Sequence, residues 1–188
     1  MTNVFTGQTM EAPLKIILYP DPRLKKISKP VTVFDENLAE FASRMFVLMR
    51  EAKGVGLAAP QVGHNIRLFV MNHDGDPAND RIYVNPQLSD ADGDAEDEEG
   101  CLSLPKVNIN VLRSKTIRIT AQDITGKSFE QLETGYLARI WQHEIDHLNG
   151  ILLTDRMGPV AKMTYKRILK DLEEKYTEQQ VPGKKRLF

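Results

Sequence analysis

The chain has a single cysteine, Cys101, so it cannot contain an intrachain disulfide framework. Such cysteine usage fits a reducing compartment. No stretch approaches the roughly 20 apolar residues of a membrane-spanning helix, so no membrane partner is expected. The segment from Met1 to Pro13 has neither the apolar run of a signal peptide nor the arginines of a transit peptide. These absences predict a cytoplasmic protein.

The chain also lacks an excess of charge of either sign. Its 25 basic and 26 acidic residues give a net charge of −1, so no overall field favours nucleic acid, and direct DNA binding is not expected. Apolar residues make up 41% and charged residues 27%, as in an ordinary globular protein. A length of 188 residues predicts one domain over residues 1–188. We expect residues 1–13 and 178–188, including the basic tail Lys184–Arg186, to be flexible ends.

The pattern of apolar residues predicts an α+β fold, with mostly antiparallel β-sheets packed around a central helix and a C-terminal helix. A first helix follows the N-cap candidate Asp35 and ends near Gly54. Predicted strands cover Leu14–Tyr19, Ile66–Met71 and Arg81–Asn85, and a hairpin joins Thr116–Ala121 to Ser128–Leu132. The acidic stretch Asp90–Glu99 is predicted to be a solvated loop. A last helix begins at Gly158–Pro159 and is expected to dock through Val160, Met163, Ile168, Leu172 and Tyr176.

The central helix, from about Gly135 to His147, carries the sequence His-Glu-x-x-His. Residues at i and i+4 lie on the same helix face, so His143 and His147 can both bind one metal ion. Glu144 lies beside them and suits a general base. Apolar residues recur at helical spacing around these three, which predicts that they are buried and need partners. A metal ion would satisfy all three.

A catalytic metal site normally has three protein ligands and one open position. A downstream carboxylate, Glu173 or Glu174, would make the third ligand of a metallopeptidase. The extended motif with a third histidine fails, because Leu153 stands at that position and no histidine follows His147. Cys101 is the other candidate, since Gly100 and Pro105 indicate a shaped turn around it and a metal would hold it as a thiolate.

The segment Gly54–Gly63 has almost no side-chain bulk, and Gln61 has its only side chain with hydrogen-bonding capacity. Two interpretations stay open: a tight turn, or a backbone that another group approaches closely. A nucleotide-binding loop is not favoured, because neither the glycine spacing nor a following lysine fits one.

Three segments together carry a family resemblance: Gly54–Gln61, Glu99–Ser103 and Gln142–His147. They resemble the three signature motifs of peptide deformylases, in the family's order, and the resemblance covers about residues 14 to 160. It implies that Cys101, His143 and His147 hold the metal and that Glu144 is the general base. It further implies that Gln61 and the backbone N–H of Leu102 bind the developing oxyanion. Gly56 would line the substrate groove, with Val55 and Gly100 beside it, and Tyr136 and Ile140 are candidate walls of a methionine pocket.

The family resemblance also implies a cofactor and a substrate. The metal would be Fe²⁺ in the cell, often replaced by Ni²⁺, Co²⁺ or Zn²⁺ in preparations. The substrate would be the N-formyl-methionyl end of nascent polypeptides in a bacterial-type cytoplasm, and the product formate. The ribosome is a further candidate partner, through basic residues of the last helix (Lys162, Lys166, Arg167, Lys170). Three rival hypotheses are a metallopeptidase using Glu173 or Glu174, a thiol enzyme using Cys101 as nucleophile, and a non-catalytic metal-binding or ribosome-docking module.

Overall fold

The computed structural model describes residues 13–180 and contains three α-helices and five strands in that range. The helices are α1 (Glu36–Glu51), α2 (Gly135–Leu148) and α3 (Pro159–Gln180). The strands are β1 (Gly56–Ala58), β2 (Leu68–Met71), β3 (Arg81–Cys101), β4 (Leu104–Gln122) and β5 (Ser128–Thr134). They form one antiparallel sheet in the order β1-β2-β3-β4-β5, which confirms the predicted fold class.

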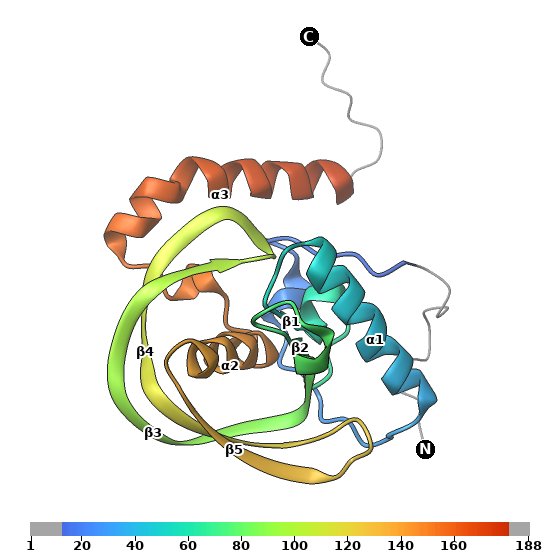
Figure 1. Ribbon diagram of the computed structural model, residues 1–188. Coiled ribbons are helices and arrows are strands. Elements are labelled where there is room, and N and C mark those ends of the chain that lie inside the picture. The colour runs from blue at the N-terminus through green and yellow to red at the C-terminus, as the bar shows by residue number, and fades with distance from the viewer. Residues whose placement is uncertain (1–12, 181–188) are drawn as a thin grey trace.

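Helix α2 lies inside the curve of the sheet. Figure 1 shows the long β3–β4 hairpin bending around α2, with α3 outside the hairpin and α1 on the other side of β1 and β2. The buried face of α2 packs its Ala138, Trp141 and Leu148 into a core with Phe69 and Ile119 from the strands. The predicted central helix is therefore confirmed. The helix carries the His-Glu-x-x-His motif within the curve of the sheet.

Helix α1 begins where the sequence predicts. The Asp35 side chain accepts a hydrogen bond from the Leu38 backbone N–H at 3.0 Å, which satisfies one of the free donors of the first turn. Phe41, Met45 and Met49 are buried on one face and form a second core with β1 and β2. This core holds the start of the Gly54–Gly63 segment in place.

The predicted strand Leu14–Tyr19 is wrong. Its backbone donates to two unrelated segments: Ile17 N–H to the Gln61 carbonyl at 2.8 Å, and Tyr19 N–H to the Ser103 carbonyl at 2.9 Å. Because each bond goes to a different partner, no continuous ladder forms. The segment instead ties together two loops that reach the candidate site.

The predicted loop at Asp90–Glu99 is also wrong, because these residues belong to β3 and pair with β4. Pairing with β2 is confined to Arg81–Val84, so this half of β3 lies at an edge and nearly all its side chains are exposed. Without a buried face there is no apolar alternation to indicate a strand. Charged side chains on a free edge oppose the addition of another strand.

Helix α3 begins at Pro159 as predicted, but its contact face differs in part from the prediction. Val160 and Met163 are 74% and 75% exposed, whereas Tyr165, Ile168 and Leu172 pack against β4 and the segment after α2. The Tyr165 hydroxyl donates to the Asn108 carbonyl at 2.6 Å and sets the register of the helix on β4.

The chain ends are described in part. Residues 178–180 form the end of α3, while residues 1–12 and the basic tail Lys184–Arg186 lie outside the described residues. No helix within residues 13–180 is long and apolar enough to cross a membrane.

Candidate active site

Cys101 ends β3, and His143 and His147 lie one turn apart on α2. One ligand atom from each residue lies within 4.8 Å of the others, the one such metal-binding group found within residues 13–180. The Cys101 Sγ is 3.2 Å from the His147 Nε2. The structure therefore brings together the three ligands that the sequence suggested.

The alternative third ligands, Glu173 and Glu174, lie on the exposed face of α3. Glu173 accepts a hydrogen bond from the Tyr19 hydroxyl at 2.7 Å, and Glu174 is 3.7 Å from the Lys170 Nζ. Neither belongs to the metal-binding group, so the metallopeptidase hypothesis is not supported.

Glu144 is buried beside the two histidines, with 4% of its surface exposed. Its Oε2 atom has no hydrogen-bond partner among the described residues. Burial raises the pKa of Glu144 to about 7, although the charges of His143 and His147 partly offset it. A carboxylate with a pKa near neutrality can both take up and release a proton.

Partial burial on its own would raise the pKa of the Cys101 thiol. The adjacent His147 and His143 outweigh burial and lower the pKa of the thiol to about 5. The thiolate is the form of cysteine that binds metals. The charge arrangement of these three residues therefore favours a metal-binding thiolate without any further cation.

The Gly54–Gly63 segment forms β1 and then a 3₁₀ helix over Ala59–Val62. A Cβ atom on Gly56 would overlap the Oε1 of Glu144 and lie 2.8 Å from its Cδ. The close-approach interpretation is therefore supported, and one approaching group is the chain's own glutamate. Only glycine leaves room for the Glu144 carboxylate here.

Gln61 is 1% exposed and its amide is fixed at both ends. Its Oε1 accepts the Ala58 N–H at 2.9 Å, and its Nε2 donates to the Ser103 Oγ at 3.2 Å. The same Nε2 lies 3.6 Å from the Cys101 Sγ, so its N–H groups face the metal-binding residues. This is a rigidly held donor beside the proposed ligands.

A cavity of about 360 Å³ opens onto these residues. The predicted substrate-binding residues all line it: Val55, Gly56, Gly100, Tyr136 and Ile140, together with Leu102. Lys53, Glu98 and Arg139 also line the cavity and were not predicted from the sequence.

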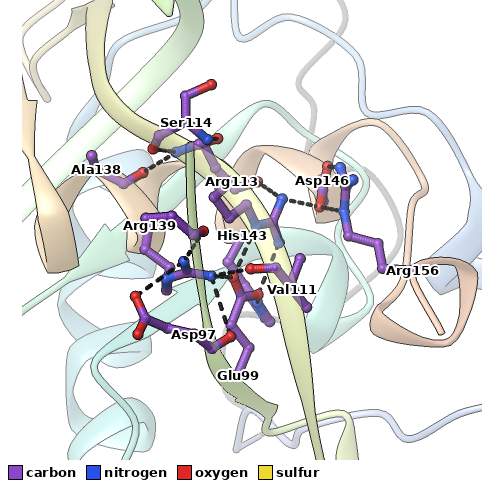
Figure 2. A network of polar contacts seen from close by, with 12 residues as sticks. Asp97, Glu99, Val111, Arg113, Ser114, Ala138, Arg139, His143, Asp146 and Arg156 are labelled. Atoms are coloured by element: carbon purple, nitrogen blue, oxygen red, sulfur yellow. Dashed lines mark hydrogen bonds and ion pairs between the residues drawn. The ribbon is translucent and has the colours of Figure 1, made fainter. Parts of the chain in front are cut away.

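Glu99 holds His143 in position, as Figure 2 shows. Its Oε2 is 2.9 Å from the His143 Nδ1, which leaves the Nε2 of the ring for a metal. Arg113 bonds both oxygens of Glu99 at 2.9 Å, and the Arg139 Nη1 lies 2.7 Å from the Oε1. Burial alone would raise the pKa of Glu99, but Arg113 and His143 outweigh it and hold that pKa well below its usual range.

The same network continues along α2 through Asp146 (Figure 2). Arg113 donates to the Asp146 Oδ2 at 2.6 Å, and Arg156 bonds both Asp146 oxygens at 2.5 Å. This network was not predicted from the sequence. Its one signal is Arg113, which continues the alternation of the buried positions Val107, Ile109 and Val111 on β4. A charged residue at an inward position of a strand requires a buried partner.

A Cys–His–His ligand set beside a buried glutamate defines the site of a metal-dependent hydrolase. Comparison with known proteins makes this more specific. Residues 13–163 match the family model of polypeptide deformylase. The chain belongs to this family of enzymes, which remove the formyl group from an N-terminal methionine, and the predicted family and enzyme class are confirmed.

Individual relatives agree with the family assignment. The chain is 43% identical to a peptide deformylase of Thermotoga maritima over 159 residues, 84% of this chain and 95% of that one. It is 42% identical to peptide deformylase 1B, chloroplastic/mitochondrial, of Arabidopsis thaliana over 92% of this chain, which spans 64% of that relative. A crystal structure of a peptide deformylase from Legionella pneumophila superposes with a TM-score of 0.82 at 43% identity, covering 88% of this chain and 98% of that one.

Proposed function

We propose that this chain removes the formyl group from the formyl-methionyl N-terminus of nascent polypeptides and releases formate. One observation carries the proposal: Cys101, His143 and His147 converge beside Glu144, whose Oε2 has no partner among the described residues, and a cavity opens onto Cys101, His143 and Glu144. Hydrolysis of a formamide needs an activated water, a donor to the formyl oxygen and a proton for the leaving amine. The residues around this cavity can supply the donor and the proton.

The residues present fit a divalent transition metal. One thiolate and two imidazoles favour Fe²⁺, Co²⁺, Ni²⁺ or Zn²⁺ over Mg²⁺ or Ca²⁺, which prefer oxygen ligands. Cys101, His143 and His147 would hold the ion, and we propose Fe²⁺ as the metal in the cell. When bound, such an ion polarises a carbonyl group and lowers the pKa of water.

Glu144 and the oxyanion donors then have separate roles. The Oε2 of Glu144 takes the proton of the attacking water and delivers it to the leaving amine. The Nε2 of Gln61 and the backbone N–H of Leu102 donate to the formyl oxygen as negative charge develops there. Because Ser103 and Ala58 fix the Gln61 amide, this donor needs no reorganisation during the reaction.

The walls of the cavity support an N-terminal methionine as the first residue of the substrate. Ile140, Leu102 and Val55 give an apolar surface, and Tyr136, which is 56% exposed, lies at the start of α2 on the cavity wall. Gly56 of β1 and Gly100 of β3 also line the cavity, so an extended peptide bound there can lie along strand backbone.

Formate release from a formyl-Met-Ala-Ser peptide by anaerobically prepared, Fe²⁺- or Ni²⁺-loaded protein tests the proposal. We expect Cys101→Ala to lose bound metal and activity together, and the matched variant Glu174→Gln on α3 to retain both. Absence of formate from the loaded protein would overturn the deformylase assignment. Activity that survives complete chelation would instead support a thiol enzyme based on Cys101.

The proposed compartment is a bacterial-type cytoplasm, which the bacterial relatives support. The Arabidopsis relative is named chloroplastic/mitochondrial, so an organellar import assay of the full-length protein distinguishes the two. Contact with the ribosome through the basic residues of α3 stays a prediction. Co-sedimentation with purified ribosomes, with and without charge reversal of Lys166 and Lys170, tests it.

A further inference from the structure

A second cavity, of about 520 Å³, lies on the opposite face of α2 from the metal-binding residues. Gln142, Ile145 and Asp146 line it from one face of α2, at spacings of i, i+3 and i+4, and the C-cap residue Asn149 continues that face. His143, Glu144 and Ile140 line the first cavity. The second cavity therefore shares a wall helix with the candidate active site but none of the side chains that line it.

Arg67 is a wall residue of the second cavity whose charge is not neutralised. Its Nη1 donates to the Asn149 Oδ1 at 2.9 Å and its Nη2 to the Pro86 carbonyl at 3.0 Å, and both acceptors are neutral. No carboxylate within the described residues 13–180 forms an ion pair with it. Burial lowers the pKa of Arg67, whereas Glu99 and Asp146 raise the pKa of Arg113 despite its burial. A half-buried cation with only neutral partners is in a favourable position to bind an anion.

Arg156 gives the second cavity another cation. Its Nε and Nη2 bond Asp146, and its Nη1 has no hydrogen-bond partner among residues 13–180. Leu88, Ile117 and Ile145 give the same wall an apolar part beside its polar residues. Cationic donors beside an apolar surface match a molecule that has one anionic end and one apolar body.

We propose that this second cavity binds a small carboxylate with an apolar body, whose carboxylate bonds Arg67 and Arg156 and whose body packs on Leu88, Ile117 and Ile145. The site is distinct from the formyl-peptide site and does not depend on the deformylase assignment. Formate itself has the anionic end but lacks the body, so it should bind far more weakly.

The probe is 4-phenylbutyrate, with the neutral isostere 4-phenylbutyramide as the matched ligand control. Zinc-loaded protein labelled at the isoleucine δ1 methyl groups reports both cavities at once, since Ile117 and Ile145 line the second and Ile140 lines the first. We expect saturable shifts of Ile117 and Ile145 with 4-phenylbutyrate, and at least tenfold weaker binding of the amide and of formate. Shifts confined to Ile140 would mean that the carboxylate binds the active-site metal, and would overturn the proposal.

Two variants of wall residues and one control variant test whether the positive charge of the wall binds the carboxylate. Arg67→Gln should weaken 4-phenylbutyrate binding about tenfold, as expected for losing one charge-assisted hydrogen-bonding group. Arg81→Gln, an exposed arginine outside the cavity, should leave the binding unchanged. Gln87→Glu leaves Arg67 intact but places a carboxylate on the wall, and should also reduce binding tenfold or more. Equal affinity in Arg67→Gln, Gln87→Glu and the unsubstituted protein would rule out an anion site here.

Discussion

The polar side chains on the two faces of α2 differ in their hydrogen bonding. On the face toward the metal ligands, Glu144 Oε2 and His147 Nδ1 are buried without hydrogen-bond partners among the described residues. On the other face, Asp146 accepts hydrogen bonds from two arginines at once. The first arrangement leaves the Glu144 Oε2 free to take part in chemistry, and the second pairs Asp146 with Arg113 and Arg156.

The difference shows where polar groups on this helix are structural and where they are reactive. Glu99 connects the two faces, since it bonds His143 on one side and Arg113 on the other. Arg113 in turn bonds Asp146, and both of these residues line the second cavity. Substitutions on the two faces of α2 and at Glu99 therefore test whether the reactive role of one face is independent of the structural role of the other.

The largest effect on the reactive face is expected for Glu144→Gln. Glutamine keeps the shape of the side chain but cannot take a proton from water, so kcat should fall about 10³-fold. Metal content measured on the purified variant should match that of the unsubstituted protein. A variant that keeps more than a tenth of the activity would mean that another group is the base.

Gly56→Ala tests the close approach to Glu144. The added methyl group overlaps the carboxylate and displaces it, so kcat should fall about 10²-fold with little change in bound metal. Gly158→Ala is the matched control, because a Cβ atom there meets nothing within 4 Å. If Gly56→Ala keeps full activity, the close approach of the Glu144 carboxylate to Gly56 is not needed for the reaction.

Glu99→Gln removes the charge that joins the two faces. Arg113 would lose its bidentate partner, so the free energy of unfolding should fall by about 3 kcal/mol. Looser support of His143 should weaken metal binding about tenfold to a hundredfold. Urea denaturation and competition with a chromogenic chelator measure the two effects separately, and an unchanged metal affinity would limit Glu99 to a structural role.

The smallest effect is expected for Asp146→Asn, on the structural face. Asp146 is more exposed than Glu99, and Arg113 keeps Glu99 as a partner, so we expect a loss of about 1 kcal/mol in unfolding free energy. Metal affinity and kcat should stay within about twofold of the starting values. A loss of metal affinity as large as that of Glu99→Gln would show that the two faces act as one unit.

The sequence predicted the elements that follow a regular period. The helix bearing His143 and His147 was located because apolar residues surround the motif at helical spacing, and Asp35 marked the start of α1 through its capping chemistry. The metal ligands and the cavity residues Val55, Gly56 and Gly100 followed from the family motifs, whereas Tyr136 and Ile140 were proposed from their positions on the helix. Each of these depends on residues close together in the chain.

The features that could not be predicted depend on distant contacts. The acidic half of β3 is held by pairing with β4, and neither of its faces is buried enough to produce an apolar period. Arg113 meets Asp146 across 33 positions, and Arg139 meets Glu99 across 40. Only the folded sheet shows which of the chain's many charged residues become buried partners.

The separation between Cys101 and His147, 46 positions along the chain, also constrains the order of assembly. The hairpin of β4 and β5 lies between the two ligand-bearing segments, so the β3–β4 turn and α2 must meet before three ligands can chelate one ion. We therefore expect full three-ligand binding only after the chain has closed this long loop, at an entropic cost that the fold rather than the ion meets. Substitutions that disrupt the packing of the β3–β4 hairpin on α2 should consequently lower metal affinity as much as substitutions of the ligands do.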